Sequence, residues 1–206
     1  MQKVAESTVR RLSFYLRVLE EFQRQGMATV SSEALASHGG TTSAQVRKDL
    51  SFFGSFGKRG LGYAVPELVG KLREILGLKR SYRVVVVGAG KIGSALAQYD
   101  GFGHRGFHVA AVYDTDPRKI GADWNGVVVR DVQHLERDLA RTPVDIAILA
   151  TPAAAAPQVS DRLVRAGIRA ILNFAPVQLD VPAGVVVKNV NMAMELEALS
   201  YALRNR

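Results

Sequence analysis

The chain has 206 residues, of which 48% are hydrophobic and 22% charged, with a formal net charge of +8 and no cysteine. This length suits two small domains, and the hydrophobic content indicates a folded protein rather than a disordered one. The absence of cysteine excludes disulfides, zinc sites with thiolate ligands and cysteine-bound iron–sulfur clusters, so a redox response would have to come from a bound cofactor.

The positive charge is concentrated near the N-terminus. Residues 1–80 hold 13 basic and 7 acidic residues, whereas residues 81–206 hold 14 and 12. A basic module beside a nearly neutral one favours a nucleic-acid partner for the first. No apolar run approaches the roughly 20 residues that span a membrane, and no apolar signal segment follows the basic start. We therefore expect a cytoplasmic protein that does not contact membranes.

The first part of the chain predicts three helices. Apolar residues at helical spacing predict a helix over residues 8–25. A serine cap begins a short second helix that ends at about residue 37. Thr42 opens a third helix over residues 43–52, with Gln45 three positions later as in a capping box.

A glycine-rich segment with a basic tip follows the third helix. In residues 52–63, aromatic residues alternate with glycines around Lys58 and Arg59, which predicts a two-stranded hairpin. A fourth helix begins at Pro66 and ends near Gly77. Helices and a basic hairpin in this order are typical of a winged helix-turn-helix.

After residue 80 the pattern changes to alternating strands and helices. The β-branched run at residues 84–87 predicts a buried parallel strand. The other candidate strands are residues 107–113, 126–129, 144–150, 170–174 and 185–190. The candidate helices between them are residues 91–99, 131–140 and 153–166. This alternation predicts a doubly wound α/β domain, and a last amphipathic helix is predicted over residues 191–204.

A glycine-rich turn follows the first strand of that α/β domain. Residues 88–93 read Gly-Ala-Gly-Lys-Ile-Gly, and Asp114 closes the second strand 21 positions after the last glycine. In this setting the first glycine allows the tight turn, Gly90 lets the backbone approach a pyrophosphate, and the third glycine packs helix against strand. The pyrophosphate would lie at the helix N-terminus. Asp114 can accept hydrogen bonds from ribose hydroxyls and would repel a 2′-phosphate, which favours NAD(H), although Arg118 and Lys119 weaken that preference.

Two further strand ends could line the nicotinamide half of this site. Residues 151–152 follow one strand and residues 173–176 follow another, and ligands of open α/β sheets lie outside the carboxyl ends of the strands. Ordinary loop structure is the alternative. The candidate cofactor-binding residues are Gly88, Ala89, Gly90, Lys91, Ile92, Gly93, Asp114, Thr151, Pro152 and Phe174.

The same sequence favours a DNA-binding regulator over an enzyme. Only 16 residues follow residue 190, which leaves no substrate domain, and none of the four histidines lies in a strand-end motif. Basic side chains bind DNA phosphates, a recognition helix reads base edges in the major groove, and Arg59 at the hairpin tip can enter a minor groove. The candidate DNA-binding residues are Gln45, Arg47, Lys48, Ser51, Lys58 and Arg59.

Three other interpretations stay open at this point. The chain could be a small NAD-dependent oxidoreductase whose first 80 residues hold the substrate. It could bind DNA constitutively and use the nucleotide only as a structural cofactor. It could also be a subunit that binds nucleotide for assembly, although such a subunit would not need basic residues on both a helix and a hairpin.

Together the motifs resemble the Rex family of redox-sensing transcriptional repressors. The resemblance rests on residues 45–54, 57–63, 88–93, 173–176 and 189–190. It implies a homodimer that represses from a palindromic operator and is released when NADH binds, with NAD⁺ as the competing ligand. It also implies that the C-terminal helix is exchanged between subunits, for which packing on its own domain is the alternative.

One departure from the family's pattern concerns the switch between the two forms. The family usually has Asp where this chain has Asn191, and the resemblance implies that this acid pairs with Arg17 and with Tyr99 near the nicotinamide. Asn191 can form hydrogen bonds but brings no charge. The next residue, often bulky and apolar in relatives, is Met192. The resemblance thus implies these four residues as the switch, and Tyr99 also as a cofactor-binding residue.

The sequence therefore predicts an α/β protein with three parts. Residues 1–80 form a winged helix-turn-helix DNA-binding domain, residues 81–190 a Rossmann-like NAD(H)-binding domain with a doubly wound parallel sheet, and residues 191–206 a dimerisation helix. The predicted function is an NADH-responsive repressor rather than an enzyme.

Overall fold

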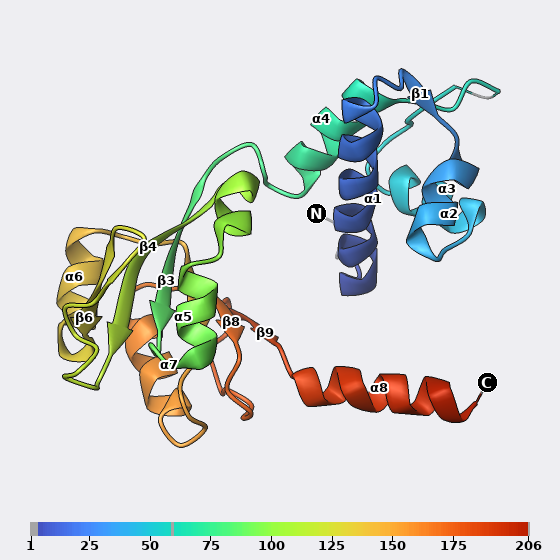
Figure 1. Cartoon of the computed structure of the whole chain (residues 1–206). Coiled ribbons are helices and arrows are strands. Elements are labelled where there is room, and N and C mark those ends of the chain that lie inside the picture. Colours follow the sequence, from blue (N-terminus) through green and yellow to red (C-terminus); the bar gives the residue numbers. More distant parts are fainter. Residues whose placement is uncertain (1–3, 59, 206) are drawn as a thin grey trace. The chain divides into compact units, whose positions relative to one another are not determined.

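A computed structural model describes residues 4–58 and 60–205 of the chain (Figure 1). The chain divides into two compact units between Arg80 and Ser81. Within the described ranges, no helix combines the length and the apolar character that a membrane crossing requires. Arg59, expected at the tip of a hairpin, lies outside the described residues.

The first unit packs four helices around one apolar core. Its elements are α1 (Glu6–Arg24), β1 (Thr29–Val30), α2 (Ser32–Gly39), α3 (Ser43–Ser51), β2 (Tyr63–Ala64) and α4 (Val65–Ile75). Leu12, Leu16 and Leu19 recur at helical spacing on α1, and each is at most 1% exposed. Burying one such side chain stabilises the fold by roughly 1.5–3 kcal/mol, so this stripe holds α1 against the other helices.

Side-chain caps set where the two short helices begin. The Ser31 hydroxyl accepts a hydrogen bond from the Ala34 N–H, and the Thr42 hydroxyl accepts one from the Gln45 N–H, both at 3.1 Å. The predicted capping box is only half formed, because the Gln45 amide donates to Asp49 at 2.8 Å instead of returning to the start of the helix. The Asp49 carboxylate, one turn further along, accepts a charge-assisted hydrogen bond from the Gln45 amide and so holds this side chain away from the Thr42 N–H.

The predicted hairpin over residues 52–63 is reduced to a single antiparallel bridge between Lys58 and Gly62. The Lys58 N–H donates to the Gly62 carbonyl at 2.9 Å, which closes a tight turn, but β2, the strand that follows this turn, pairs antiparallel with β1 instead. Gly62 has a φ of +78°, and a Cβ there would overlap the Val30 carbonyl oxygen. The glycine therefore lets the segment approach β1 closely, and this approach replaces the expected ladder.

The second unit is built on a seven-stranded sheet in the order β5-β6-β4-β3-β7-β8-β9. Its strands are β3 (Tyr82–Val87), β4 (Phe107–Asp114), β5 (Asp123–Trp124), β6 (Val127–Asp131), β7 (Ile146–Leu149), β8 (Ala170–Asn173) and β9 (Val186–Asn189). All pairs are parallel except the short edge pair of β5 with β6, which the sequence did not predict. The order runs outward from β3 in both directions, as in the predicted doubly wound sheet.

Helices cover both faces of this sheet. They are α5 (Lys91–Ala97), η1 (Asp100–Arg105), η2 (Val132–His134), α6 (Leu135–Arg141) and α7 (Ala156–Arg165). Leu139 of α6 and Leu163 of α7 belong to one apolar cluster, whereas Ala97 of α5 and Phe102 of η1 belong to the other. The four valines of β3 alternate between these clusters, which explains why the strand is apolar at four consecutive positions.

The last helix, α8 (Met192–Arg204), buries none of its side chains within the single chain. The Asn191 side-chain oxygen caps it, accepting from the Ala193 N–H at 3.0 Å and from the Met194 N–H at 3.4 Å. The apolar side chains of α8 are 61–73% exposed and comprise Met192, Met194, Leu196, Leu199, Tyr201 and Leu203. So much apolar surface on one helix marks an interaction site.

Candidate nucleotide pocket and DNA-binding face

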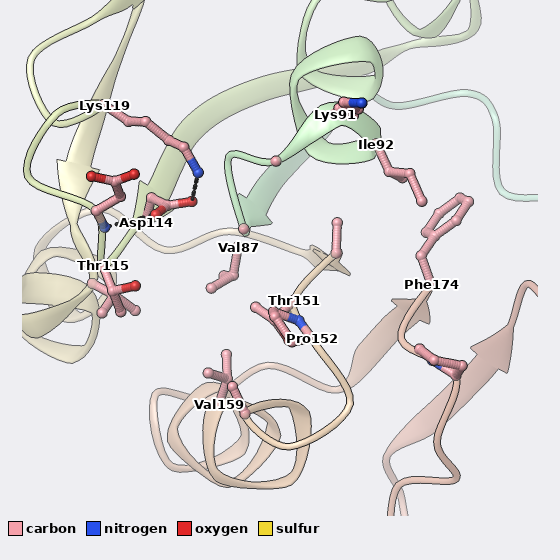
Figure 2. Close-up of a pocket in the computed structure, with 17 residues that line it drawn as sticks. Val87, Lys91, Ile92, Asp114, Thr115, Lys119, Thr151, Pro152, Val159 and Phe174 are labelled. Atoms are coloured by element: carbon pink, nitrogen blue, oxygen red, sulfur yellow. Dashed lines mark hydrogen bonds and ion pairs between the residues drawn. The ribbon is translucent and has the colours of Figure 1, made fainter.

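A pocket of about 540 Å³ opens at the carboxyl ends of β3, β4, β7 and β8 (Figure 2). It lies where the strand order reverses, between β3 and β7, which is where ligands bind in open α/β sheets. The predicted cofactor residues that line it are Gly88, Gly90, Lys91, Ile92, Asp114, Thr151, Pro152 and Phe174. Residues from four separate strand ends are thus brought to one site.

Three other predicted cofactor residues, Ala89, Gly93 and Tyr99, do not line this pocket. Ala89 is buried, and its N–H donates to the Asp114 carboxylate at 2.6 Å, so it cannot also face a phosphate. Tyr99 is 60% exposed and packs edge-on against Phe102. Ala89 therefore shapes the turn from within, whereas Tyr99 presents its ring to the surface.

The three glycines of the turn differ in what a side chain would meet. A Cβ at Gly88, where φ is +104°, would overlap the Ala150 carbonyl oxygen, and a Cβ at Gly93 would overlap the Gly88 carbonyl oxygen. At Gly90 a Cβ would point into open space, with no heavy atom of the described residues within 4 Å. The fold itself requires Gly88 and Gly93, whereas Gly90 keeps the pocket clear.

The Asp114 carboxylate ties the pocket's loops together. One oxygen accepts from the Ala89 N–H and lies 3.4 Å from the Lys119 ammonium, and the other accepts from the Asp116 N–H at 2.8 Å. A carboxylate has about four lone-pair positions, so three are occupied before any ribose arrives. A ribose that bonds through both hydroxyls would have to displace Lys119, the weakest of the three contacts.

The second basic residue beside this acid is already paired. The Arg118 guanidinium donates two hydrogen bonds to Asp116, at 3.0 and 2.8 Å, and the Arg118 backbone N–H donates a third at 3.0 Å; together they lower the pKa of Asp116 to about 2. Lys119 lies against Asp114. The two cations that weakened the predicted preference for NAD(H) thus each have a carboxylate partner.

The pocket combines an apolar wall with one unsatisfied polar atom. Figure 2 shows the Phe174 ring beside Ile92, with Pro152 on the neighbouring loop. The Thr151 hydroxyl oxygen is buried and has no hydrogen-bond partner among the described residues. Leaving such a group unpaired costs about 1–3 kcal/mol, so a bound polar ligand could recover that cost.

Sequence reasoning left part of this pocket unassigned. Pro176 lies in the segment 173–176 predicted for the nicotinamide half, and the unassigned lining residues are Val87, Thr115, Asp116, Lys119, Val132, Ala150, Ala155 and Val159. Most of them adjoin the strand ends that were predicted, so the strand-end rule could have found them. Val132 and Val159 belong to helices that pack across the sheet, and no local pattern reports that proximity.

Asn173, expected on the nicotinamide side, is instead fully buried and forms hydrogen bonds to the backbone of neighbouring segments. Its amide nitrogen donates to the Val177 carbonyl at 2.8 Å and to the Asn189 side chain at 2.9 Å, and its oxygen accepts from the Ala175 N–H at 3.0 Å. The Asn173 carbonyl also accepts from the Val190 N–H at 2.8 Å. Asn173 therefore ties the loop that carries Phe174 to the segment that leads into α8.

The predicted DNA-binding side chains that the structure describes lie on the surface of the first unit, apart from Gln45, which is half-buried. Lys48 is exposed on α3, and Lys58 is exposed on the glycine-rich turn. The Arg47 guanidinium donates to the Ser32 hydroxyl at 2.8 Å and lies 3.5 Å from the Glu33 carboxylate. An exposed pair of this kind is worth about 0–1 kcal/mol, so Arg47 can be redirected at little cost.

A buried carboxylate that sequence reasoning missed anchors α3 to α1. Asp49 is 0% exposed and accepts from Arg11 twice, at 2.6 and 2.7 Å, from Tyr15 at 3.0 Å and from Gln45 at 2.8 Å. Burial alone would raise the pKa of Asp49, but the hydrogen bonds, led by that from Arg11, lower it below its usual value. Burial and Asp49 together raise the pKa of Tyr15 to about 12. The signal in the sequence that could have revealed Asp49 is an acidic residue on the apolar face of a short helix.

The predicted switch residues lie in different parts of the chain. Arg17 is exposed on α1 in the first unit, and Tyr99 is exposed in the second. Asn191 caps α8 through its side-chain oxygen, and Met192, the first residue of that helix, is 68% exposed.

Comparison with known proteins identifies the family. Residues 79–177 match the family model described as "CoA binding domain", and residues 3–51 match "Putative DNA-binding protein N-terminus". The redox-sensing transcriptional repressor Rex of Carboxydothermus hydrogenoformans is 48% identical over 98% of this chain and 97% of its own length. The chain belongs to the Rex family. Rex of Thermus thermophilus is also 48% identical, over 98% of this chain and 95% of its own.

Solved Rex structures share the whole fold. RSP in complex with β-NAD⁺ and operator DNA has a TM-score of 0.94 and 41% identity, covering 100% of this chain and 94% of that one. RSP in complex with β-NADH has a TM-score of 0.90 and 40% identity, covering 100% and 96%. The predicted fold class is confirmed. The prediction of a transcriptional regulator rather than an enzyme is confirmed as well, because these relatives are repressors.

Proposed function

We propose that this Rex-family chain is an NADH-responsive repressor that binds a palindromic operator as a homodimer in the cytoplasm. One observation carries the proposal: the pocket at the strand switch point and the basic α3 belong to a chain that matches RSP, solved with NAD⁺ and operator DNA, along its full length. In this assignment residues 1–80 bind DNA, residues 81–190 bind NAD(H), and residues 191–206 form the dimer.

The direct test is a titration of DNA binding with NADH at fixed salt. A duplex would first be selected by the parental chain from a random-sequence pool, since the operator is defined by what the protein selects. We expect NADH to release the chain from that duplex, and NAD⁺ to oppose the release by competition. Release by neither nucleotide, or turnover of NADH with carbonyl substrates, would contradict the proposal.

The pocket's chemistry fits a dinucleotide. Gly90 leaves room for a pyrophosphate to approach the backbone, and Asp114 can accept a hydrogen bond from a ribose hydroxyl. The Thr151 hydroxyl has no hydrogen-bond partner among the described residues, and a ligand could supply one. We assign the nicotinamide to the side walled by Pro152 and Phe174. That ring is cationic in NAD⁺ and neutral in NADH, and an apolar wall disfavours the cation. The pocket therefore favours NADH.

Removing the Asp114 carboxylate should change which dinucleotide binds. In Asp114→Ala, NADH should bind about tenfold more weakly, because a charged hydrogen bond is worth roughly 1.5–3 kcal/mol. The affinity for NADPH should fall much less, since Lys119 would be free to bind the 2′-phosphate. Fluorescence titration with both nucleotides measures the ratio. Lys119→Ala added to the first change should weaken NADPH binding as much as NADH binding, and an unchanged affinity ratio in Asp114→Ala would contradict the assignment.

Removing basic side chains from α3 should weaken specific DNA binding but leave nucleotide binding unchanged. Arg47→Ala or Lys48→Ala should cost about 1–3 kcal/mol if the side chain contacts a base edge, while NADH affinity stays at the parental value. Lys71→Ala, an exposed lysine of α4, is the matched control. Equal duplex binding by parent and variants across salt concentrations would remove these residues from the interface. Ser51, Lys58 and Arg59 are proposed as further contacts.

Coupling between the two sites is assigned to the start of α8. A nucleotide shifts DNA affinity only as far as it prefers one arrangement of the chain over the other. Asn173 joins the Phe174 loop to the strand that leads into α8, so a ligand against Phe174 can act on the helix. Arg17, Tyr99, Asn191 and Met192 are proposed as the residues whose contacts change.

Replacing Asn191 with the Asp that is usual in the family should stabilise the DNA-binding form. Asn191→Asp keeps an oxygen for capping α8 and adds a charge for Arg17, and a charged hydrogen bond is worth roughly 1.5–3 kcal/mol against about 1 for a neutral one. We expect tighter DNA binding and a several-fold higher NADH concentration for release. Arg17→Ala in the same background should cancel most of the gain. The idea is wrong if release is unchanged or the gain survives without Arg17.

A further inference from the structure

The orientation of the Gln45 amide on α3 is determined by its contact with Asp49. The carboxylate can only accept, so the amide group 2.8 Å from it must be the NH₂, which fixes which end of the amide is nitrogen. One of the two amide hydrogens is therefore used, and one hydrogen and the carbonyl oxygen remain. Gln45 is half-buried and lies in the first turn of α3, where its backbone N–H is capped by Thr42.

The Asp49 carboxylate that binds this amide accepts three further hydrogen bonds. Arg11 donates to both of its oxygens, and Tyr15 donates to the oxygen that Gln45 does not use. The exposed fraction of Asp49 is 0%, so no water competes for it. The amide is thus anchored to a group that cannot turn, and its side-chain entropy is lost on folding rather than on binding.

The remaining hydrogen and oxygen match one base. In the major groove adenine presents an acceptor, N7, beside a donor, the 6-amino group, whereas guanine presents two acceptors. A free glutamine can turn to suit either purine, but an amide with one hydrogen engaged offers one donor and one acceptor side by side. Guanine would face the amide oxygen with its own O6, which is repulsive.

We propose that Asp49 is a positioning residue that holds the Gln45 amide in the orientation that selects adenine in the operator. The inference rests on the proposed DNA-binding function and on recognition helices meeting bases with their N-terminal residues. Asp49 touches no DNA in this account. Its role is exerted through Gln45.

The experiment measures base preference, which loss of structure alone would not redistribute. The full chain selects its duplex from a random-sequence pool, and each base pair of that duplex is then replaced in turn. We expect one adenine in each half-site to be preferred over guanine by about tenfold or more. In Gln45→Ala this preference should fall to within about threefold, with preferences at other positions unchanged. Asp49→Asn should flatten the same position.

Two controls separate positioning from stability. Tyr15→Phe removes a hydrogen bond to the other Asp49 oxygen, so it should keep the adenine preference whatever it costs in stability. If Asp49→Asn does not fold, hydrogen exchange of the Gln45 side-chain amide in the parental chain decides instead. One protected hydrogen supports the proposal, and two that exchange equally fast overturn it.

The failures of the two proposals are distinguishable. A chain that selects no duplex refutes the proposed function, and this inference with it. A chain that selects a duplex but keeps its adenine preference in Gln45→Ala refutes this inference alone. A uniform loss of affinity in Asp49→Asn, with the adenine preference intact, also overturns it.

Discussion

Gly90→Val is expected to abolish dinucleotide binding while the chain stays folded. The backbone at Gly90 is extended, with φ of −80° and ψ of −170°, which valine adopts readily, and a Cβ there meets no atom of the described residues. The side chain would instead occupy the space assigned to the pyrophosphate. We expect NADH affinity to fall by about a hundredfold or more, which corresponds to roughly 2.8 kcal/mol. Titration of NADH fluorescence measures it.

The neighbouring glycine supplies the matched control. Gly93→Val places a Cβ on the Gly88 carbonyl oxygen, so this variant should lose stability as well as nucleotide binding. Gly90→Val should instead melt within a few degrees of the parent, still bind DNA and ignore NADH. Parental NADH affinity in Gly90→Val would show that the pyrophosphate lies elsewhere.

Leu199→Asp on α8 is expected to turn the dimer into a monomer. Met192, Leu196, Leu199 and Leu203 share one side of the helix and are exposed in the single chain, so a second copy is the proposed cover. Each buried leucine contributes roughly 1.5–3 kcal/mol, and the change occurs twice per dimer. The dimer dissociation constant should rise by about a hundredfold or more. Sedimentation measures it.

Operator binding should weaken with the loss of the dimer, because a palindrome is bound by two half-sites at once. Glu197→Ala, on another side of the same helix, should leave both the dimer and the operator affinity unchanged. A Leu199→Asp chain that remains dimeric at the parental concentration would exclude α8 from the interface. NADH binding to the monomer would show that the nucleotide pocket is complete within one chain.

Local patterns account for most of the elements and for the nucleotide turn. Helix starts at the serine and threonine caps, the β-branched strand β3 and the glycine-rich turn depend on residues within about five positions of one another. These preferences act before any tertiary contact forms, so the sequence alone determined them. The same holds for α8, whose apolar spacing predicted a helix that needs a partner.

Long-range contacts decided what the sequence could not. β2 pairs with β1 rather than within a hairpin because Gly62 lets it approach Val30 from across the unit. Asp49 is held by Arg11, 38 positions away, and Asn173 by Asn189, 16 positions away. Val159 reaches the pocket only because α7 packs across the sheet. A sequence window reports the propensity of a segment, but which distant polar groups satisfy one another once water is excluded depends on the packed fold.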